Sequence, residues 1–141
     1  MNWASWAVIT AVFYSLFDFF VKKTAGRVED GLASFIFNVV SAVVLAFYLL
    51  VGKYQGLKVF TTSEGLLYNI LGGILIGLAS ITFIKVFSTG SNLSIGVAIV
   101  RIGTVVLAVL LGIIIFHEKL DGRQIFGLLL ALIGIGLLLV K

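Results

Sequence analysis

The chain has 141 residues, of which 61% are hydrophobic and 11% charged, with a formal net charge of +4. Soluble domains carry roughly 45–50% apolar and 25% charged residues, so this composition excludes a soluble protein and indicates an integral membrane protein. The chain has no cysteine, which excludes disulfides and thiolate metal sites. It also has no basic stripe of the kind that a nucleic-acid-binding surface needs, so no nucleic-acid partner is expected.

Five hydrophobic stretches follow one another along the chain. About 20 residues at a rise of 1.5 Å cross a hydrocarbon core of about 30 Å, so stretches of this length predict transmembrane helices. Barrel strands would alternate apolar and polar residues, and these stretches do not. We therefore expect an all-α, multi-pass protein of the cell (inner) membrane. It would form one domain over residues 1–141, with spans at about 3–21, 32–51, 66–87, 93–116 and 124–140.

The loop charges give no clear orientation. Five spans place the termini on opposite sides, which we name side A for the N-terminal side and side B for the other. Side A carries four Lys or Arg residues in its loops, and side B carries four, or five with Lys85. Orientation follows the Lys/Arg asymmetry between loops, so this balance fits either insertion in both orientations or an orientation set by another detail.

One full charge interrupts the fourth stretch. Arg101 lies about ten residues into an otherwise apolar run. A central arginine costs at least about 2.5–3.5 kcal/mol in a bilayer, so a partner, a cavity or a ligand must offset the cost. Arg101 is therefore a candidate for binding a substrate carboxylate or phosphate. The alternatives are an ion pair with Asp18 and hydrogen bonds to backbone carbonyls.

Two further charges lie near the side-B ends of their spans. Asp18 is the only acidic residue within a span, which makes it a candidate for proton coupling. Lys85 is a candidate substrate ligand. The two residues are alternatively expected to pair with each other or to extend to the interface.

Polar and aromatic side chains complete the candidate substrate site. Asn38 in the second span offers orienting hydrogen bonds, although such groups more often tie helices together. The first span is rich in aromatic residues, including Tyr14 and Phe17. Phe17 belongs to a helical stripe that fits either the wall of a substrate cavity or a packing and lipid-facing surface.

No signature of an enzyme is visible. The sequence has no Gly-rich phosphate loop, nucleophile elbow or catalytic triad. With one histidine and no cysteine, neither a metal site nor a cofactor is expected.

The C-terminal part carries a recognisable pattern. The run GIIIFHEKLDGRQIFGLLLALIGIG resembles the end of the EamA domain of the drug/metabolite transporter superfamily. That domain has a glycine in its fourth helix and a glutamate six residues later, as at Gly112 and Glu118. Glycines in its fifth helix match Gly127 and Gly134. The family often has a proline where this chain has Val105, and Gly103 lies nearby.

The resemblance implies a transporter. Most members look like two such domains fused in inverted orientation, and this chain looks like one of them. An antiparallel homodimer that moves small metabolites or drug-like solutes by alternating access is therefore expected. The surplus of intramembrane positive charge favours anionic or zwitterionic substrates. The alternatives are a subunit of a lipid or lipid-linked sugar flippase and a non-transporting scaffold or regulatory subunit.

Overall fold

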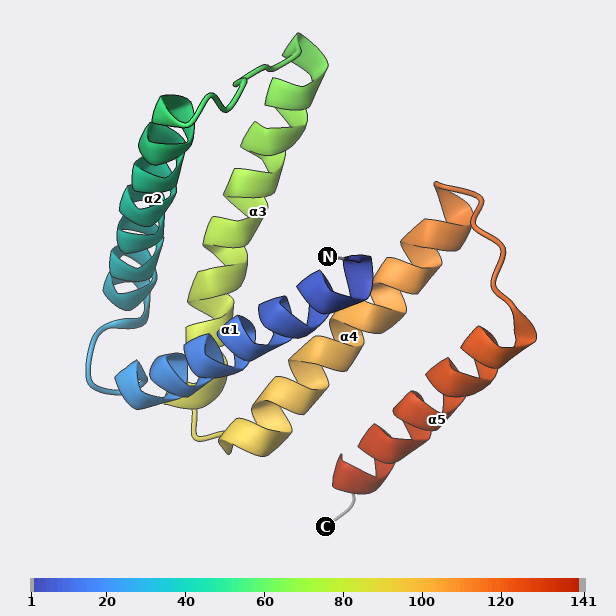
Figure 1. The fold of residues 1–141 in the computed structure, drawn as a ribbon. Helices are drawn as coiled ribbons and strands as arrows, with labels where there is room; N and C mark the ends of the chain where they lie inside the picture. The colour runs from blue at the N-terminus through green and yellow to red at the C-terminus, as the bar shows by residue number, and fades with distance from the viewer. Residues whose placement is uncertain (1, 140–141) are drawn as a thin grey trace. The chain divides into compact units, whose positions relative to one another are not determined.

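The computed structural model describes residues 2–139, and within them every regular element is a helix. The helices are α1 (Trp3–Thr24), α2 (Asp30–Tyr54), α3 (Ser63–Ser88), α4 (Leu93–Ile114) and α5 (Gly122–Leu139), as Figure 1 shows. By length and apolar composition, α1 to α4 are each able to cross a membrane. In α5, the apolar stretch runs over Gly122–Gly134. The prediction of an all-α membrane protein is confirmed.

The helices α2 and α3 begin before their predicted spans, because the side chains of Glu29 and Thr62 cap them. The Asn2 side chain accepts a hydrogen bond from the Ser5 N–H at 2.9 Å and caps α1 at its predicted start. Thr62 Oγ1 accepts from the Gly65 N–H at 3.0 Å and caps α3. Such side chains satisfy N–H groups that have no partner within the helix, so the helix begins before its apolar stretch.

The fourth helix ends earlier than predicted. It stops at Ile114 rather than residue 116, because His117 adopts a φ of 52° and the chain turns back on itself. The helix continues without a break through Gly103 and Val105, so the missing proline leaves it regular. The predicted end of the fifth span at Val140 lies outside the described residues.

The end of α2 is closed by a glycine turn. Gly56 has a φ of 87°, its N–H donates to the Lys53 carbonyl at 3.1 Å, and the Leu57 N–H donates to the Gly52 carbonyl at 2.8 Å. This pair of bonds is the Schellman arrangement, which satisfies the last helix carbonyls. The Leu57 side chain covers Gly52, where an added Cβ would lie 2.9 Å from Leu57 Cδ2. A side chain at either glycine would disturb the turn.

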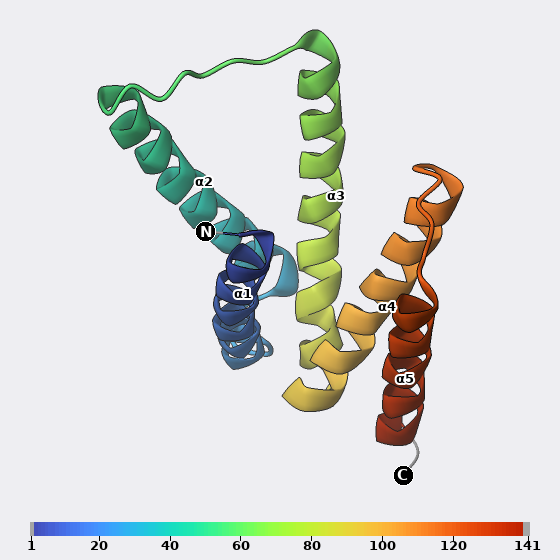
Figure 2. The same cartoon turned by 45° about the vertical axis from the view of Figure 1, so that its right-hand side comes forward.

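The helices fall into two compact units, Met1–Thr89 and Gly90–Lys141. In the first unit, α1 and α2 both pack against α3. The buried residues of this unit all lie toward its side-B end; they are Asp18, Val21, Ala33, Ser34, Ile84 and Phe87. Figure 2 shows α2 and α3 close together at this end and diverging toward the other. In the second unit, α4 packs along α5.

The carboxylate of Glu29 makes the start of α2 sensitive to pH. Its two oxygens accept from the Gly31 N–H at 2.9 Å and the Leu32 N–H at 2.7 Å. These hydrogen bonds hold the pKa of Glu29 below its usual 4.5, and the bond from Gly31 has the larger effect. A lowered pKa stabilises the fold above pH 4.5, and this stabilisation is lost as the pH falls through 4.5 and then through the lowered value.

We therefore expect wild-type protein to lose stability below pH 4.5 by more than the Glu29→Gln variant, whose amide cannot titrate. Thermal unfolding followed by circular dichroism in detergent, over a pH series that brackets this value, measures the difference between the two profiles. Parallel profiles for the two proteins would contradict the capping role.

Candidate functional site

A hydrogen-bonded junction joins α2 to α3 inside the apolar region. The hydroxyls of Ser34 and Ser80 are hydrogen-bonded to each other. The Asn38 side-chain N–H₂ donates to Ser80 Oγ at 2.9 Å and to the Ser34 carbonyl at 2.8 Å. Ser80 Oγ also lies 2.9 Å from the Gly77 carbonyl. We name these three residues the polar junction. A junction of this kind joins helices where lipid offers no polar partner.

Aromatic rings from all three helices of the first unit meet at the same level. The Phe17 ring lies edge-on to Phe37, with centroids 5.5 Å apart, and stacked on Phe83 at 6.4 Å. Phe83 in turn meets Phe87 edge-on at 5.2 Å. Such offset pairs are favourable beyond their buried area. Phe17 therefore fixes α1 against α2 and α3, while its predicted part in substrate binding stays a prediction.

The first unit also contains a buried acid. Asp18 follows Phe17 on α1 and is only 4% exposed, so it is the most deeply buried charged group in the first unit. Asp18 interacts with another group of the protein. Burial of an acidic group inside a membrane helix is rare and commonly marks a functional position.

The remaining candidates are spread over both units. Tyr14 and Lys85 are exposed, and within residues 2–139 no ion pair joins Lys85 to Asp18. Arg101 lies on α4 in the second unit, where it is half-buried and not without a partner. Phe17, Asp18 and Asn38 all belong to the first unit, and their roles in binding stay predictions.

Sequence reasoning missed the two serines of the polar junction. Ser34 precedes Asn38 by four residues, a spacing that puts both on one helix face and could have indicated a shared partner. Thr82 also carries a hydroxyl on α3, but this hydroxyl bonds only to its own helix, at the Leu78 and Ala79 carbonyls.

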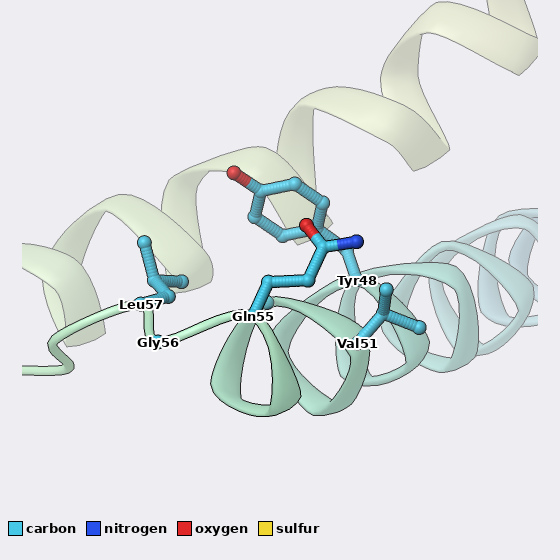
Figure 3. A pocket seen from close by; sticks show the side chains of 6 residues that line it. Tyr48, Val51, Gln55, Gly56 and Leu57 are labelled. Atoms are coloured by element: carbon cyan, nitrogen blue, oxygen red, sulfur yellow. The ribbon is translucent and has the colours of Figure 1, made fainter.

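Two hollows are lined by none of these residues. One of about 340 Å³ surrounds the end of α2 and is lined by Tyr48, Val51, Gly52, Gln55, Gly56 and Leu57. Figure 3 shows the Tyr48 and Gln55 side chains beside the glycine turn. The other, of about 450 Å³, lies between α4 and α5 with an apolar lining that includes Gly103 and Gly136. Neither contains a charged residue, so neither is the candidate site.

The glycine and glutamate of the C-terminal pattern are in contact. The Glu118 N–H donates to the Gly112 carbonyl at 3.0 Å, and the Glu118 side chain folds back over this buried glycine. A Cβ at Gly112 would lie 2.6 Å from Glu118 Oε2. The six-residue spacing therefore has a physical reason, since it lets the carboxylate occupy the space that a side chain would fill.

These features define a class of protein. Long apolar helices, polar groups joined within the membrane region and a charge in the middle of α4 are typical of a multi-pass membrane transport protein. The sequence profile of the EamA-like transporter family matches residues 1–140. The chain belongs to the EamA-like transporter family, whose members are membrane transporters of the drug/metabolite type rather than enzymes.

The resemblance predicted from Gly112, Glu118 and the glycines of the fifth span is thus confirmed at the level of the family. No curated protein and no solved structure matches the chain.

The contact between Gly112 and Glu118 predicts energetic coupling. Replacing a helical glycine by alanine ordinarily stabilises by roughly 0.5–1 kcal/mol. In Gly112→Ala we expect this gain to be offset, because the new methyl group displaces the Glu118 carboxylate. In a Glu118→Ala background the full gain should return. Unfolding free energies measured in lipid bicelles for the four proteins give the coupling.

The matched control is Gly103→Ala on the same helix, where an added Cβ meets nothing within 4 Å. Its effect should be the same with and without Glu118. Additivity of Gly112→Ala and Glu118→Ala to within about 0.5 kcal/mol would contradict the coupling.

Proposed function

We propose that this chain moves small anionic or zwitterionic solutes across the membrane by alternating access, as an antiparallel homodimer. The observation that carries the proposal is Arg101, a guanidinium held half-buried on an uninterrupted apolar helix. A guanidinium presents five donors in a fork that matches carboxylate or phosphate groups. It therefore favours substrates that bring a negative charge to α4.

The acid on α1 extends the proposal to zwitterions and to protons. Asp18 is buried in the first unit, and its neighbour in the sequence, Phe17, contacts Phe37. A carboxylate in such surroundings suits a substrate ammonium group or a proton that travels with the substrate. The polar junction of the same unit suits neutral hydrogen-bonding groups.

Glycine-lined helix faces support pairing with a second copy. Added Cβ atoms at Gly73, Gly77, Gly127 and Gly134 would each meet nothing within 4 Å. Small residues let membrane helices approach closely, and within the described part of each unit no neighbour fills that space. The balanced loop charges favour a second copy in the opposite orientation.

The role of Arg101 predicts a loss of transport. Proteoliposomes would be tested with labelled alanine, lactate and tetraphenylphosphonium as zwitterionic, anionic and cationic probes. Loss of a charge-assisted hydrogen bond costs about 1.5–3 kcal/mol, so Arg101→Ala should lower the uptake of alanine or lactate by at least about tenfold. Arg123→Ala, which removes the same charge from an exposed position, is the control and should retain uptake.

If Arg101→Ala takes up alanine and lactate as fast as wild type does, this role for Arg101 is contradicted. Uptake of tetraphenylphosphonium alone would contradict the preference for negative charge.

The antiparallel pair predicts two orientations in one membrane. The chain has no cysteine, so Thr61→Cys on side A and Asn92→Cys on side B each introduce a single label site without changing the charge balance. A membrane-impermeant thiol reagent applied to intact cells should label about half of each variant, because each loop faces outward in half of the copies. Permeabilised cells give the total.

Full labelling of one variant with no labelling of the other would show a single orientation. The self-paired antiparallel dimer would then be wrong.

A further inference from the structure

The contacts between α2 and α3 are confined to one end of the pair. Within residues 2–139, the hydrogen bonds that join them are those of the polar junction and one from Ser88 Oγ to Asp30 Oδ2 at 3.0 Å. All of them lie between residues 30–38 of α2 and residues 80–88 of α3. The buried residues Ala33, Ser34, Ile84 and Phe87 lie in the same two segments. The side-B end of the pair is therefore fixed.

Within the first unit, the other halves of the two helices do not pack against each other. Every residue from 39 to 51 on α2 and from 66 to 76 on α3 is exposed. Each stretch is longer than two helical turns, so exposure extends around the whole circumference of the helix. On α3, added Cβ atoms at Gly72 and Gly73 would meet nothing within 4 Å. Figure 2 shows the two helices separating along these stretches.

The connection at the open end leaves room for movement. After the glycine turn, residues 57–62 have no regular structure, and Figure 2 shows them extended between the two helix ends. A short extended connection limits the separation of the helices without fixing it. Fixed ends at side B, with an irregular connection and no interhelical hydrogen bonds among the described residues at side A, are the arrangement of a hinge.

We propose that the polar junction of Ser34, Asn38 and Ser80 is a pivot on which α2 and α3 change their separation at side A. Its part in transport rests on the alternating access proposed above. Lys53 lies nineteen residues beyond Ser34 on α2, which is about 28 Å of helix. A rotation of about 10° at the junction therefore moves the open end by about 5 Å, which is on the order of a side chain's width.

Hydroxyl and amide groups suit a pivot better than a rigid apolar contact. A hydroxyl proton rotates to follow its acceptor, and Ser80 Oγ has both the Gly77 carbonyl and the Ser34 hydroxyl within reach. Asn38 spans both helices, since its N–H₂ group bonds to Ser34 on its own helix and to Ser80 on the other. The helices can thus tilt about this point while their hydrogen bonds are kept.

Pulsed electron–electron distance measurements between nitroxide labels test the pivot without a substrate. One cysteine pair, Leu50→Cys with Leu67→Cys, reports on the open end, and a second, Phe35→Cys with Ala79→Cys, reports on the junction. All four positions are exposed. Labelled full-length protein in liposomes is diluted with unlabelled chain, so that only distances within one chain are recorded.

We expect a distance distribution at least about twice as wide at the open end as at the junction, because displacement grows with distance from the pivot. Ser80→Ala should widen the distribution at the junction, and Ser80→Thr, which keeps the hydroxyl, should not. Thr82→Val is the matched control, because the Thr82 hydroxyl bonds only to its own helix. Equal widths at the two ends, or no response to Ser80→Ala, would overturn the pivot.

A reducible cross-link across the Leu50→Cys and Leu67→Cys pair separates the pivot from the proposed function. If both are right, the cross-link stops uptake of alanine or lactate, and reduction restores it. Uptake that continues in cross-linked protein overturns the part of the pivot in transport. If the distance distribution at the open end is broad but the protein takes up none of the probes, the result supports the pivot and counts against the proposed function.

Discussion

Hydrogen bonds between α2 and α3 hold the first unit together, because lipid removes the hydrophobic drive that pairs apolar helices in water. An interhelical hydrogen bond in a membrane contributes about 0.6 kcal/mol on average and up to about 1.7 kcal/mol. The polar junction concentrates several of them at one level, where Asn38 reaches both serines. The rings of Phe17 and Phe83 then stack at that level and bring α1 into place.

The position of the polar junction decides which end of the first unit is packed. The junction fixes the side-B ends of α2 and α3, and Asp18 is buried toward the same end of α1. The side-A halves of α2 and α3 have no comparable contacts within the described part of the chain and are exposed over residues 39–51 and 66–76. If the chain works by the alternating access proposed above, a unit packed at one end only can change conformation at small energetic cost.

Much of the fold follows from the sequence. The apolar stretches predict the helices, because about 20 apolar residues have few other stable arrangements in lipid. Helix ends are less predictable, since Glu29 and Thr62 extend helices through hydrogen bonds that depend on backbone geometry. The end of α4 at Ile114 depends on the left-handed conformation of His117, which a non-glycine residue rarely adopts.

The candidate site is only partly readable from the sequence. Charged residues in apolar helices stand out because their burial is costly, which is why Asp18 and Arg101 were predicted. Ser34 and Ser80 do not stand out, because hydroxyls in helices commonly bond to their own backbone, as those of Thr82 and Thr104 do. Whether a hydroxyl bonds to its own backbone or to a side chain on the other helix depends on how α2 packs against α3.

The most direct test of this account is a double-mutant cycle between Ser34 and Ser80. Unfolding free energies would be measured in bilayers for wild type, Ser34→Ala, Ser80→Ala and the double variant. The account predicts a favourable coupling of about 0.6–1.7 kcal/mol between the two hydroxyls. A coupling indistinguishable from zero would mean that the polar junction does not hold α2 to α3, and the organisation described for the first unit would be wrong.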